Sequence, residues 1–221
     1  MTHEEEKWFE NPDRYKILMD GRWELKDLSK LPSVFEQCYS FVYCFDAEIG
    51  AINPERIEIA LRNYPWRGGF SYVNIYTVLR NQVQWRDRPR VNEIKYASPG
   101  WIELALNLEV AVQVAQAVAK IAASAAAVAI SYRAGDKALK DIKTYREKAK
   151  LKYLELTVAQ DAILLNHCQT HAKFLGFRSV KELIQKTGST EVALRLLLAH
   201  SRRLDDLAQF IDDGKIKLPS K

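Results

Sequence analysis

The stretch most suggestive of a binding site is the segment YPWRGGFS, which begins at Tyr64. Glycines let the backbone approach a ligand closely, an arginine pairs with phosphate, and aromatic rings stack on bases. The segment lacks the Gly-Lys-Ser/Thr step of a phosphate-binding Walker loop. We therefore consider two interpretations: a nucleotide or nucleic-acid site that shares the arginines of the later loop QWRDRPR, and a tight turn between helices. The candidate ligand-binding residues are Tyr64, Trp66, Arg67, Gly68, Gly69, Arg86, Arg88 and Arg90.

Histidine spacing offers a weaker possibility. His167 and His171 are four residues apart on a predicted helix, which suits a metal ion, and His200 on the last helix is a possible third ligand. There is no Glu in the HExxH position, and Cys168 points about 100° away from His167 on a helix. Ordinary surface or interface histidines are the preferred interpretation. With no Gly-x-Ser-x-Gly motif either, we expect no metal or other cofactor, and nothing in the sequence supports an enzyme.

The stretch from Trp101 to Tyr132 contains no Pro or internal Gly and is rich in Ala, the best helix former, so it predicts one long helix. Its polar residues recur every three or four positions and share one stripe, whereas the rest of the surface is small or apolar. Such a helix must bury most of its circumference in protein or in lipid. The stripe consists of Glu109, Gln113, Gln116, Lys120 and Ser124.

Three surroundings are compatible with this helix. It is the central member of a soluble bundle, or it packs against its copies in an oligomer, or residues 110–132 enter a membrane on activation. The last segment is about 35 Å long, enough to span a bilayer. Lys120 near its centre would cost about 2.5–3.5 kcal/mol there, so the soluble bundle is the preferred interpretation.

Composition sets broader bounds. The chain has 221 residues, of which 48% are hydrophobic and 28% charged, as expected for a folded soluble protein. The acidic N-terminus has no apolar core of a secretory signal, and three cysteines are too few for a disulfide framework, so we expect a cytoplasmic protein. The net charge is +5. Basic residues concentrate at 133–155, for which a solvated helix face with internal ion pairs is preferred over a nucleic-acid or lipid surface.

In the N-terminal half, Asp20-Gly21 predicts a β-hairpin, and Asn53-Pro54 predicts a helix start. Residues 32–46 are ambiguous: a short helix running into a strand is favoured, with one continuous helix as the alternative. Ser98-Pro99-Gly100 is expected to end a strand and start the long helix. The predicted elements are strands 14–19 and 22–27, helix 32–38, strand 39–46, helices 54–63 and 71–83, and strand 90–98.

In the C-terminal half, Ala134-Gly135-Asp136 is expected to connect the long helix to a second one at 136–174, with which it forms an antiparallel hairpin. Helices at 179–186 and 190–213 follow, and the tail after Gly214 is expected to be loose. The predicted fold class is α+β and mostly helical: a small mixed sheet-and-helix unit at 14–98, followed by a helical unit at 99–214 with a long hairpin and C-terminal helices.

The residues from Ile94 to Gly100 form the pattern I-x-Y-x-S-P-G at a predicted strand end, followed by an Ala-rich helix and a charged helix. With the preceding YPWRGGFSYVNIY, this resembles uncharacterised bacterial proteins, some of which occur near anti-phage or other conflict genes. The resemblance covers about residues 23–150 and carries no catalytic residues with it.

Together these features predict a non-enzymatic bacterial effector or adaptor that self-associates through its long helices, with a role in anti-phage defence implied by the resemblance. The α+β unit would dock a partner or ligand. One alternative is a nucleotide or nucleic-acid binding protein that uses the YPWRGG turn. The other is a membrane-active effector that inserts the 110–132 helix on activation. The expected partners are copies of the chain, a nucleotide or nucleic acid, and a membrane.

Overall fold

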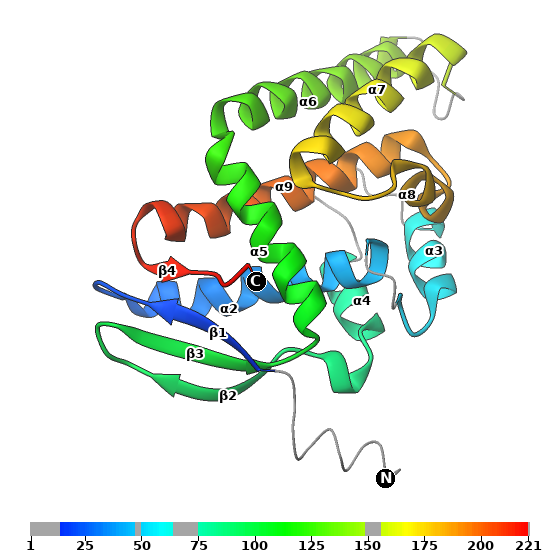
Figure 1. Ribbon diagram of the computed structural model, residues 1–221. Coiled ribbons are helices and arrows are strands. Elements are labelled where there is room, and N and C mark those ends of the chain that lie inside the picture. Colours follow the sequence, from blue (N-terminus) through cyan, green and yellow to red (C-terminus); the bar gives the residue numbers. More distant parts are fainter. Residues whose placement is uncertain (1–13, 47–49, 64–74, 149–155, 221) are drawn as a thin grey trace.

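The computed structural model describes residues 14–46, 50–63, 75–148 and 156–220. The chain is 70% helical, and its described part forms eight helices and a four-stranded antiparallel sheet, which confirms the predicted mostly helical α+β class (Figure 1). The elements are β1 (Arg14–Met19), α2 (Leu25–Phe45), α3 (Pro54–Asn63), α4 (Ile75–Gln82), η1 (Trp85–Asp87), β2 (Arg90–Lys95), β3 (Gly100–Ala105), α5 (Leu108–Ala123), α6 (Ala125–Lys148), α7 (Val158–Leu175), α8 (Val180–Thr187), α9 (Thr190–Asp212) and β4 (Ile216–Lys217).

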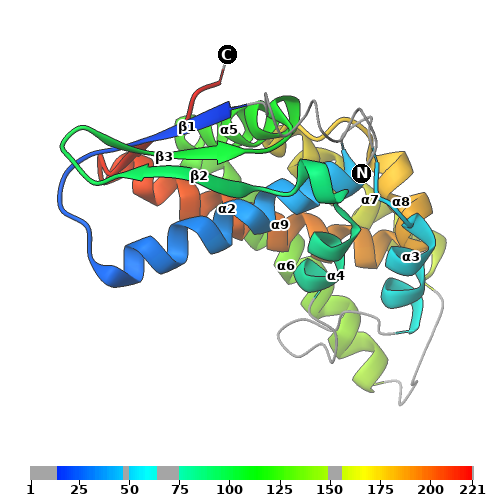
Figure 2. The same cartoon turned by 90° about the horizontal axis from the view of Figure 1, so that it is seen from below.

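The sheet has the strand order β2-β3-β1-β4 and lies at the end of the molecule remote from α6 and α7 (Figures 1 and 2). In β1, Tyr15, Ile17 and Met19 are buried and alternate with exposed residues, so one face of the sheet is the inner face. The ring of Tyr15 stacks on Phe35 of α2, 6.0 Å between centroids. Helix α2 therefore covers the inner face, and the other face is free to carry polar side chains.

The hairpin predicted at Asp20-Gly21 is wrong. Strand β1 pairs with β3 and β4, and residues 22–27 do not form a strand. Gly21 does adopt a positive φ of 67°, as the turn signal requires. However, Glu24 and Asp27 form a reciprocal capping box that starts α2 immediately afterwards. The local turn was recognisable, but the element after it is a helix.

The favoured prediction of a short helix followed by a strand at 32–46 is also wrong, and the alternative of one continuous helix is correct. The β-like run Tyr39 to Phe45 is helical, and every residue in it is buried, since α2 packs against α4, α5 and α9. A helix that is surrounded on all sides loses the amphipathic pattern by which helices are recognised in a sequence. Tertiary packing overrides β propensity here.

The long helix predicted from Trp101 to Tyr132 is wrong at its start. Residues Gly100–Ala105 form β3, which pairs with β1 on one side and β2 on the other. A Cβ at Gly100 would collide with the backbone of Lys95 and Ala97, so the β2–β3 turn requires glycine at this point. The helix α5 begins only after Asn107, whose side chain accepts a hydrogen bond from the amide of Val110.

The same prediction is wrong in its middle, because the helix breaks at Ser124. The axes of α5 and α6 meet at 94°, although neither Pro nor Gly is present at the break. The Ser124 hydroxyl donates to the carbonyl of Lys120, which satisfies part of the α5 terminus. Within the described residues, no single helix has the length and apolar character to span a membrane; α5 and α6 meet that test only as a bent pair.

The connector predicted at Ala134-Gly135-Asp136 is wrong as well. All three residues lie inside α6, where Gly135 is buried against Leu194 and Leu198 of α9. The second helix predicted at 136–174 is instead the end of α6 and all of α7, separated by residues outside the described part. Helices α6 and α7 pack side by side and run in opposite directions (Figure 1). The predicted helical hairpin therefore exists, but it lies one helix later in the chain.

Most of the remaining predictions of helices and strands are confirmed, and the prediction for the C-terminal tail is wrong. Helices α3, α4, α8 and α9 and strand β2 are confirmed, with Gly176 and Gly214 at positive φ where helices were expected to end. The loose tail is wrong, because Ile216 is buried and β4 pairs with β1. Helix α9 packs on α2, α5 and α7, and one hydrophobic core spans both predicted units. The predicted boundary between residues 98 and 99 falls inside the β2–β3 hairpin.

Candidate functional site

Five of the predicted ligand-binding residues lie outside the described residues. They are Tyr64, Trp66, Arg67, Gly68 and Gly69, all in the YPWRGG segment between α3 and α4. The proposed site at that segment stays a prediction.

The three arginines of the later loop, QWRDRPR, lie in the described part of the chain, and each makes a different contact. Arg88 donates hydrogen bonds to the carbonyls of Val83 (3.1 Å) and Asn81 (3.4 Å), so it holds the loop together. Arg86 lies beside Asp87 at 3.9 Å and is half exposed. The guanidinium of Arg90 lies over the ring of Trp85, 5.8 Å from its centroid. Of the three, Arg90 is the one that belongs to the sheet.

Helix α2 holds the loop around Asp87 in place through hydrogen bonds from two tyrosines. The Tyr39 hydroxyl donates to the carbonyl of Asp87 at 2.6 Å, and the Tyr43 hydroxyl donates to the Asp87 carboxylate at 2.7 Å. Both tyrosines and Asp87 are buried. Because buried hydrogen bonds of this kind hold a loop in one geometry, Trp85 and Arg90 are presented from a fixed base.

The strand register gathers cations on the outer face of the sheet. Side chains that face each other across an antiparallel ladder share a face, and Tyr15, Ile17 and Met19 define the inner one. The partners of the alternate positions therefore form the outer face: Arg14 and Lys16 from β1, Trp101 and Glu103 from β3, Arg90 and Lys95 from β2, and Lys217 from β4. Residues far apart in the sequence thus form one basic surface, here called the outer sheet face.

Trp101 lies at the centre of this face. The ammonium of Lys95 is 4.5 Å from the centroid of its ring, and that of Lys16 is 5.0 Å from it. Both distances are within the range of cation–π attraction, so the ring holds two cations from the neighbouring strands. The Trp101 side-chain Nε1 is buried and has no hydrogen-bond acceptor among the described residues.

Glu103 is a buried carboxylate at the base of the outer sheet face. Its side chain is 2% exposed and accepts from Asn92 at 2.6 Å, with Lys16 at 3.1 Å and Arg14 at 3.2 Å. The hydrogen bond from Asn92 and, to a smaller extent, the one from Lys16 hold the pKa of Glu103 below its usual range. The carboxylate therefore remains ionised and fixes the directions of the two cations.

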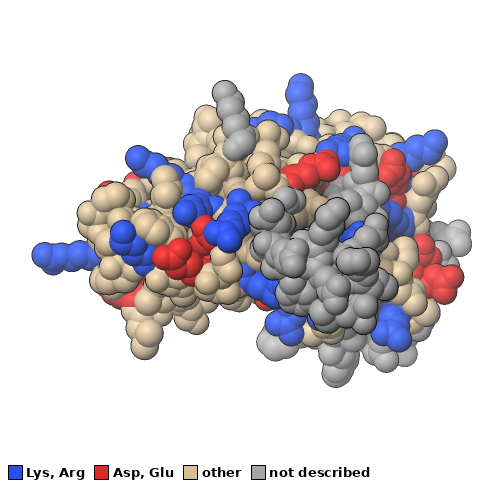
Figure 3. Space-filling model, turned by 60° about the horizontal axis from the view of Figure 1, so that its bottom comes forward, with Lys and Arg blue, Asp and Glu red and all other residues tan. Residues whose placement is uncertain are grey.

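The charge of the face remains positive after these pairings. Its five cationic residues face two carboxylates, Glu103 and its register neighbour Glu93. Figure 3 shows this side of the molecule, with Lys and Arg side chains gathered around a smaller acidic group. Lys95 and Lys217 are exposed and take no part in the ion pairs of Glu103. The outer sheet face is suited to an anionic partner that also offers a flat surface to an aromatic ring.

No protein-family model, curated protein or solved structure matches the chain. The site must therefore be interpreted from its own chemistry. Lys16, Lys95 and Trp101 were not among the predicted site residues. The sequence predicts a helix at residue 101, and no local pattern shows that β1 and β2 pair with β3 on its two sides. The available signal was the alternation of basic and apolar residues in RYKILM, which places Arg14 and Lys16 on one side of a strand. In RVNEIK, Arg90 and Lys95 are five residues apart and share a face only because the register shifts between Val91 and Glu93.

The predicted polar stripe of α5 mostly contacts its own chain. The carboxylate of Glu109 pairs with Arg178 at 3.3 Å and accepts from Gln113 at 3.3 Å. Gln116 donates to the carbonyl of Ser220 at 3.5 Å. The end of Lys120 lies against Gly176, and Ser124 bonds back to the carbonyl of Lys120. The stripe is on the outside of α5 and helps to hold the α7–α8 turn and the C-terminus; its use between copies of the chain stays a prediction.

The histidines do not converge on a metal site. In the described parts of the chain, no group of three or more His, Cys, Asp or Glu side chains is arranged to hold a metal ion. His171 is buried and within 3.1 Å of the Ser131 hydroxyl, and His200 is buried and stacks on Phe41, 4.0 Å between centroids. Burial lowers the pKa of His171 to about 4 and that of His200 to about 3. Both are neutral core residues at pH 7.

The basic run after residue 133 is partly paired with carboxylates in the described part. Lys140 pairs with Asp136 at 2.6 Å and Lys143 with Glu147 at 3.7 Å, each along one face of α6. Arg146 reaches across to Glu191 of α9 at 2.9 Å. These contacts fit the preferred interpretation of a solvated helix face with ion pairs, and they distinguish this run from the outer sheet face.

Proposed function

We propose that the protein binds single-stranded nucleic acid across the outer sheet face. The observation that carries this proposal is the position of Trp101, whose ring lies on that face between the ammonium groups of Lys16 and Lys95. Nonspecific single-strand binding combines aromatic rings for base stacking with cations that follow the phosphates. The outer sheet face combines the same two elements.

Position along the face gives each group a role. Lys95 and Lys217 lie on strands at opposite edges of the sheet, and neighbouring strands are about 4.8 Å apart. A strand of nucleic acid crossing from β2 to β4 would pass Lys95, Trp101, Lys16 and Lys217 in turn. The first three side chains contact phosphate or base, and Lys217 extends the positive surface. Arg90 on Trp85 offers a second cation–aromatic pair at the β2 edge.

A single strand suits this surface better than a duplex. The face is a short, twisted sheet with its tryptophan near the centre, and a base can stack on that ring only when it is unpaired. An anionic lipid surface would use the same lysines and also accommodates a tryptophan at the headgroup level, but it offers no base to stack on the ring. The two partners are therefore separable by experiment.

The test is a titration of a fluorescent single-stranded oligonucleotide, followed by anisotropy over a range of salt concentrations. We expect Lys95→Ala to weaken binding and to reduce the slope of log K against log salt by about 0.7, because one phosphate contact is lost. We expect Trp101→Leu to weaken binding by about 1–3 kcal/mol through lost stacking, with a smaller change in salt dependence.

Lys137→Ala is the matched control, since Lys137 is an exposed lysine on α6, remote from the sheet (Figure 1). It removes the same charge and should leave both affinity and slope nearly unchanged. Equal losses for Lys95→Ala and Lys137→Ala would mean that only net charge matters. Binding to phosphatidylserine vesicles without binding to any oligonucleotide would replace the proposal by a lipid surface.

The self-associating effector or adaptor predicted from the sequence, and its role in defence, stay predictions beside this proposal. One observation favours self-association: Ile130 is 67% exposed, next to exposed alanines at the start of α6. Mass by light scattering tests it, and a monomer at micromolar concentration, with and without oligonucleotide, would exclude it. The membrane-active alternative would need residues 110–121, now largely buried in the core, to leave the fold.

A further inference from the structure

Strand β2 forms an open edge of the sheet. It pairs with β3 on one side, and no other strand of the described residues pairs with its second side. Figures 1 and 2 show β2 along the margin of the sheet, with β3 between it and β1. Alternate residues of an edge strand turn their N–H and C=O groups outward, where a further strand can pair with them. The second side of β2 is therefore a template for another chain.

The inner side of β2 is apolar and uncovered. Val91 lies opposite Leu104 in the strand register, and Ile94 lies opposite Ile102. Both therefore belong to the inner face of the sheet. Their two partners on β3 are buried, whereas Val91 and Ile94 are each more than half exposed, as is Tyr96 directly after the strand. The cover of the inner face thus ends at β3 and leaves the apolar residues of β2 in solvent.

The two charged residues beside Ile94 have opposite signs and lie on the outer face. Neither Glu93 nor Lys95 forms an ion pair with another described residue, and Glu93 lies directly opposite a second carboxylate, Glu103. Charged residues on an edge strand normally repel a second copy of that strand. Because Glu93 and Lys95 are placed symmetrically about Ile94, an antiparallel copy would bring unlike charges together.

We propose that two copies of the chain pair through β2, antiparallel and with a two-fold axis at Ile94. In this register Ile94 faces its own copy, and Glu93 of each chain lies opposite Lys95 of the other. Unlike charges and β-branched residues directly across an antiparallel pair are both stabilising. A two-fold contact uses the same patch on both chains, and β2 is complementary to itself in this way. A strand from an unrelated protein would not need that symmetry.

The contact is short, and this sets its strength. The register of β2 shifts between Val91 and Glu93, so the regular ladder is limited to a few residues around Ile94. Small interfaces of this kind belong to weak or transient complexes. We therefore expect a dimer that forms as the protein concentration rises, and not a permanent one.

The geometry joins the two outer sheet faces. Antiparallel strands of one sheet are related by an axis perpendicular to it, so both outer faces would lie on the same side of a continuous sheet. The two Trp101 rings would then be three strand spacings apart, about 14 Å across the strands. The dimer itself does not depend on the proposed nucleic-acid binding, and its test uses the protein without nucleic acid.

The test is sedimentation equilibrium of the full chain from micromolar to millimolar concentration. We expect the parent protein to dimerise with rising concentration. Glu93→Lys should weaken the dimer about tenfold or more, because it turns both attractive pairs into repulsive ones, and Lys95→Glu should do the same. The double variant with both substitutions should recover the parent's dimerisation constant. Both residues are exposed, so all three variants should fold normally.

Two control variants separate this edge from the rest of the surface. Glu147→Lys makes the same charge reversal on α6, remote from the sheet, and should leave the dimer unchanged (Figure 1). Ile130→Lys, at the exposed start of α6, should also leave it unchanged. A dimer lost in Ile130→Lys but kept in Glu93→Lys would assign self-association to α6 and overturn the proposal. A monomer at millimolar concentration, or no recovery in the double variant, would equally overturn it.

Discussion

Helices α5 and α6 are consecutive and both begin with alanine-rich sequence, yet their surroundings are opposite. In α5, Val110, Val114 and Val118 are fully buried, and the helix packs against α2, α7 and α9. In the first turns of α6, Ala127 and Ile130 are exposed, and burial is confined to a narrow line of residues. The two halves of one predicted helix therefore have different roles: α5 fills the core, and α6 covers α7 and α9 with one side only.

The difference shows that apolar composition measures what a helix can bury, and not what it does bury. The predicted wide apolar surface is real in α5, where protein covers it. In α6, the break at Ser124 turns the same kind of sequence out of the core at 94°. Three experiments test this comparison between a buried and a partly exposed helix.

The largest effect is expected from acid, which acts on two buried histidines of α7 and α9, the helices that α6 covers. Ser131 of α6 lies against His171, whose pKa is lowered to about 4 by burial, and His200 nearby has a pKa of about 3. Unfolded histidine has a pKa of about 6.5. Below that pH the unfolded state binds protons that the folded state does not, so stability is intact above pH 6.5 and falls as pH decreases toward 4.

We expect a loss of several kcal/mol over this pH range, measured by denaturant unfolding at pH 7, 6, 5 and 4. His171→Gln keeps a polar group for Ser131 but does not titrate, so its stability should depend less steeply on pH. An equally steep decline in His171→Gln and the parent protein would show that other groups cause the acid sensitivity.

The next effect compares one residue type in the two helices. Ile121 of α5 is 1% exposed and Ile130 of α6 is 67% exposed. Ile121→Ala should lower the free energy of unfolding by about 2–5 kcal/mol, because it leaves a cavity in the core. Ile130→Ala should change it by no more than about 0.5 kcal/mol. Similar losses for the two variants, measured at pH 7, would mean that α6 is as buried as α5.

The smallest effect is a gain. Gly135 lies within α6, and a Cβ built there would be 3.5 Å from the side chains of Leu194 and Leu198, an ordinary contact. Gly135→Ala should raise the free energy of unfolding by about 0.5–1 kcal/mol, since alanine is favoured over glycine in a helix. A loss of stability instead would indicate that α6 packs more tightly on α9 than this spacing implies.

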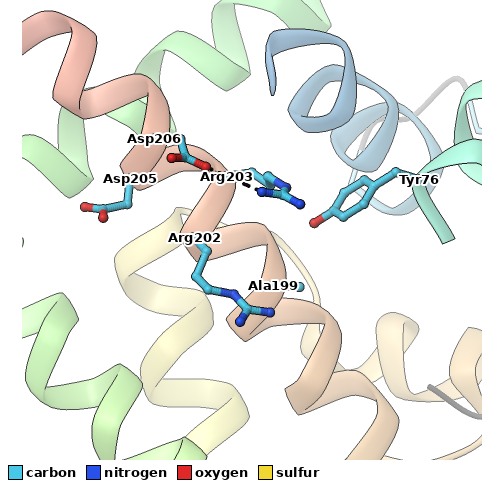
Figure 4. Close-up of a pocket in the computed structure, with 6 residues that line it drawn as sticks. All are labelled: Tyr76, Ala199, Arg202, Arg203, Asp205 and Asp206. Carbon is cyan, nitrogen blue, oxygen red and sulfur yellow. Dashed lines mark hydrogen bonds and ion pairs between the residues drawn. The ribbon is translucent and has the colours of Figure 1, made fainter. Parts of the chain in front are cut away.

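The candidate site, like the burial of α5 and α6, depends on which distant segments of the chain pack together. Arg90 was predicted from its place in an arginine-rich loop, and it does lie at the edge of the outer sheet face. Lys16 and Trp101 were missed because they are 85 positions apart and meet only through the pairing of β1 with β3. Pairing of this kind is a long-range choice that a local pattern does not contain. A hollow lined by Tyr76 of α4 and by Arg203 of α9 is likewise formed by segments far apart in the sequence (Figure 4).

The sequence by itself determined the local signals of this protein. The alternation in β1, the Asn53 side chain that accepts from the amide of Arg56 at the start of α3, and the glycines that end α7 and α9 all act over a few residues, so they hold in any surroundings. Only the tertiary structure decided that 39–45 is helical, that α5 ends at Ser124, and that five cations share one face of the sheet. Each of these depends on which surface covers which, and that is settled by burial across the whole chain.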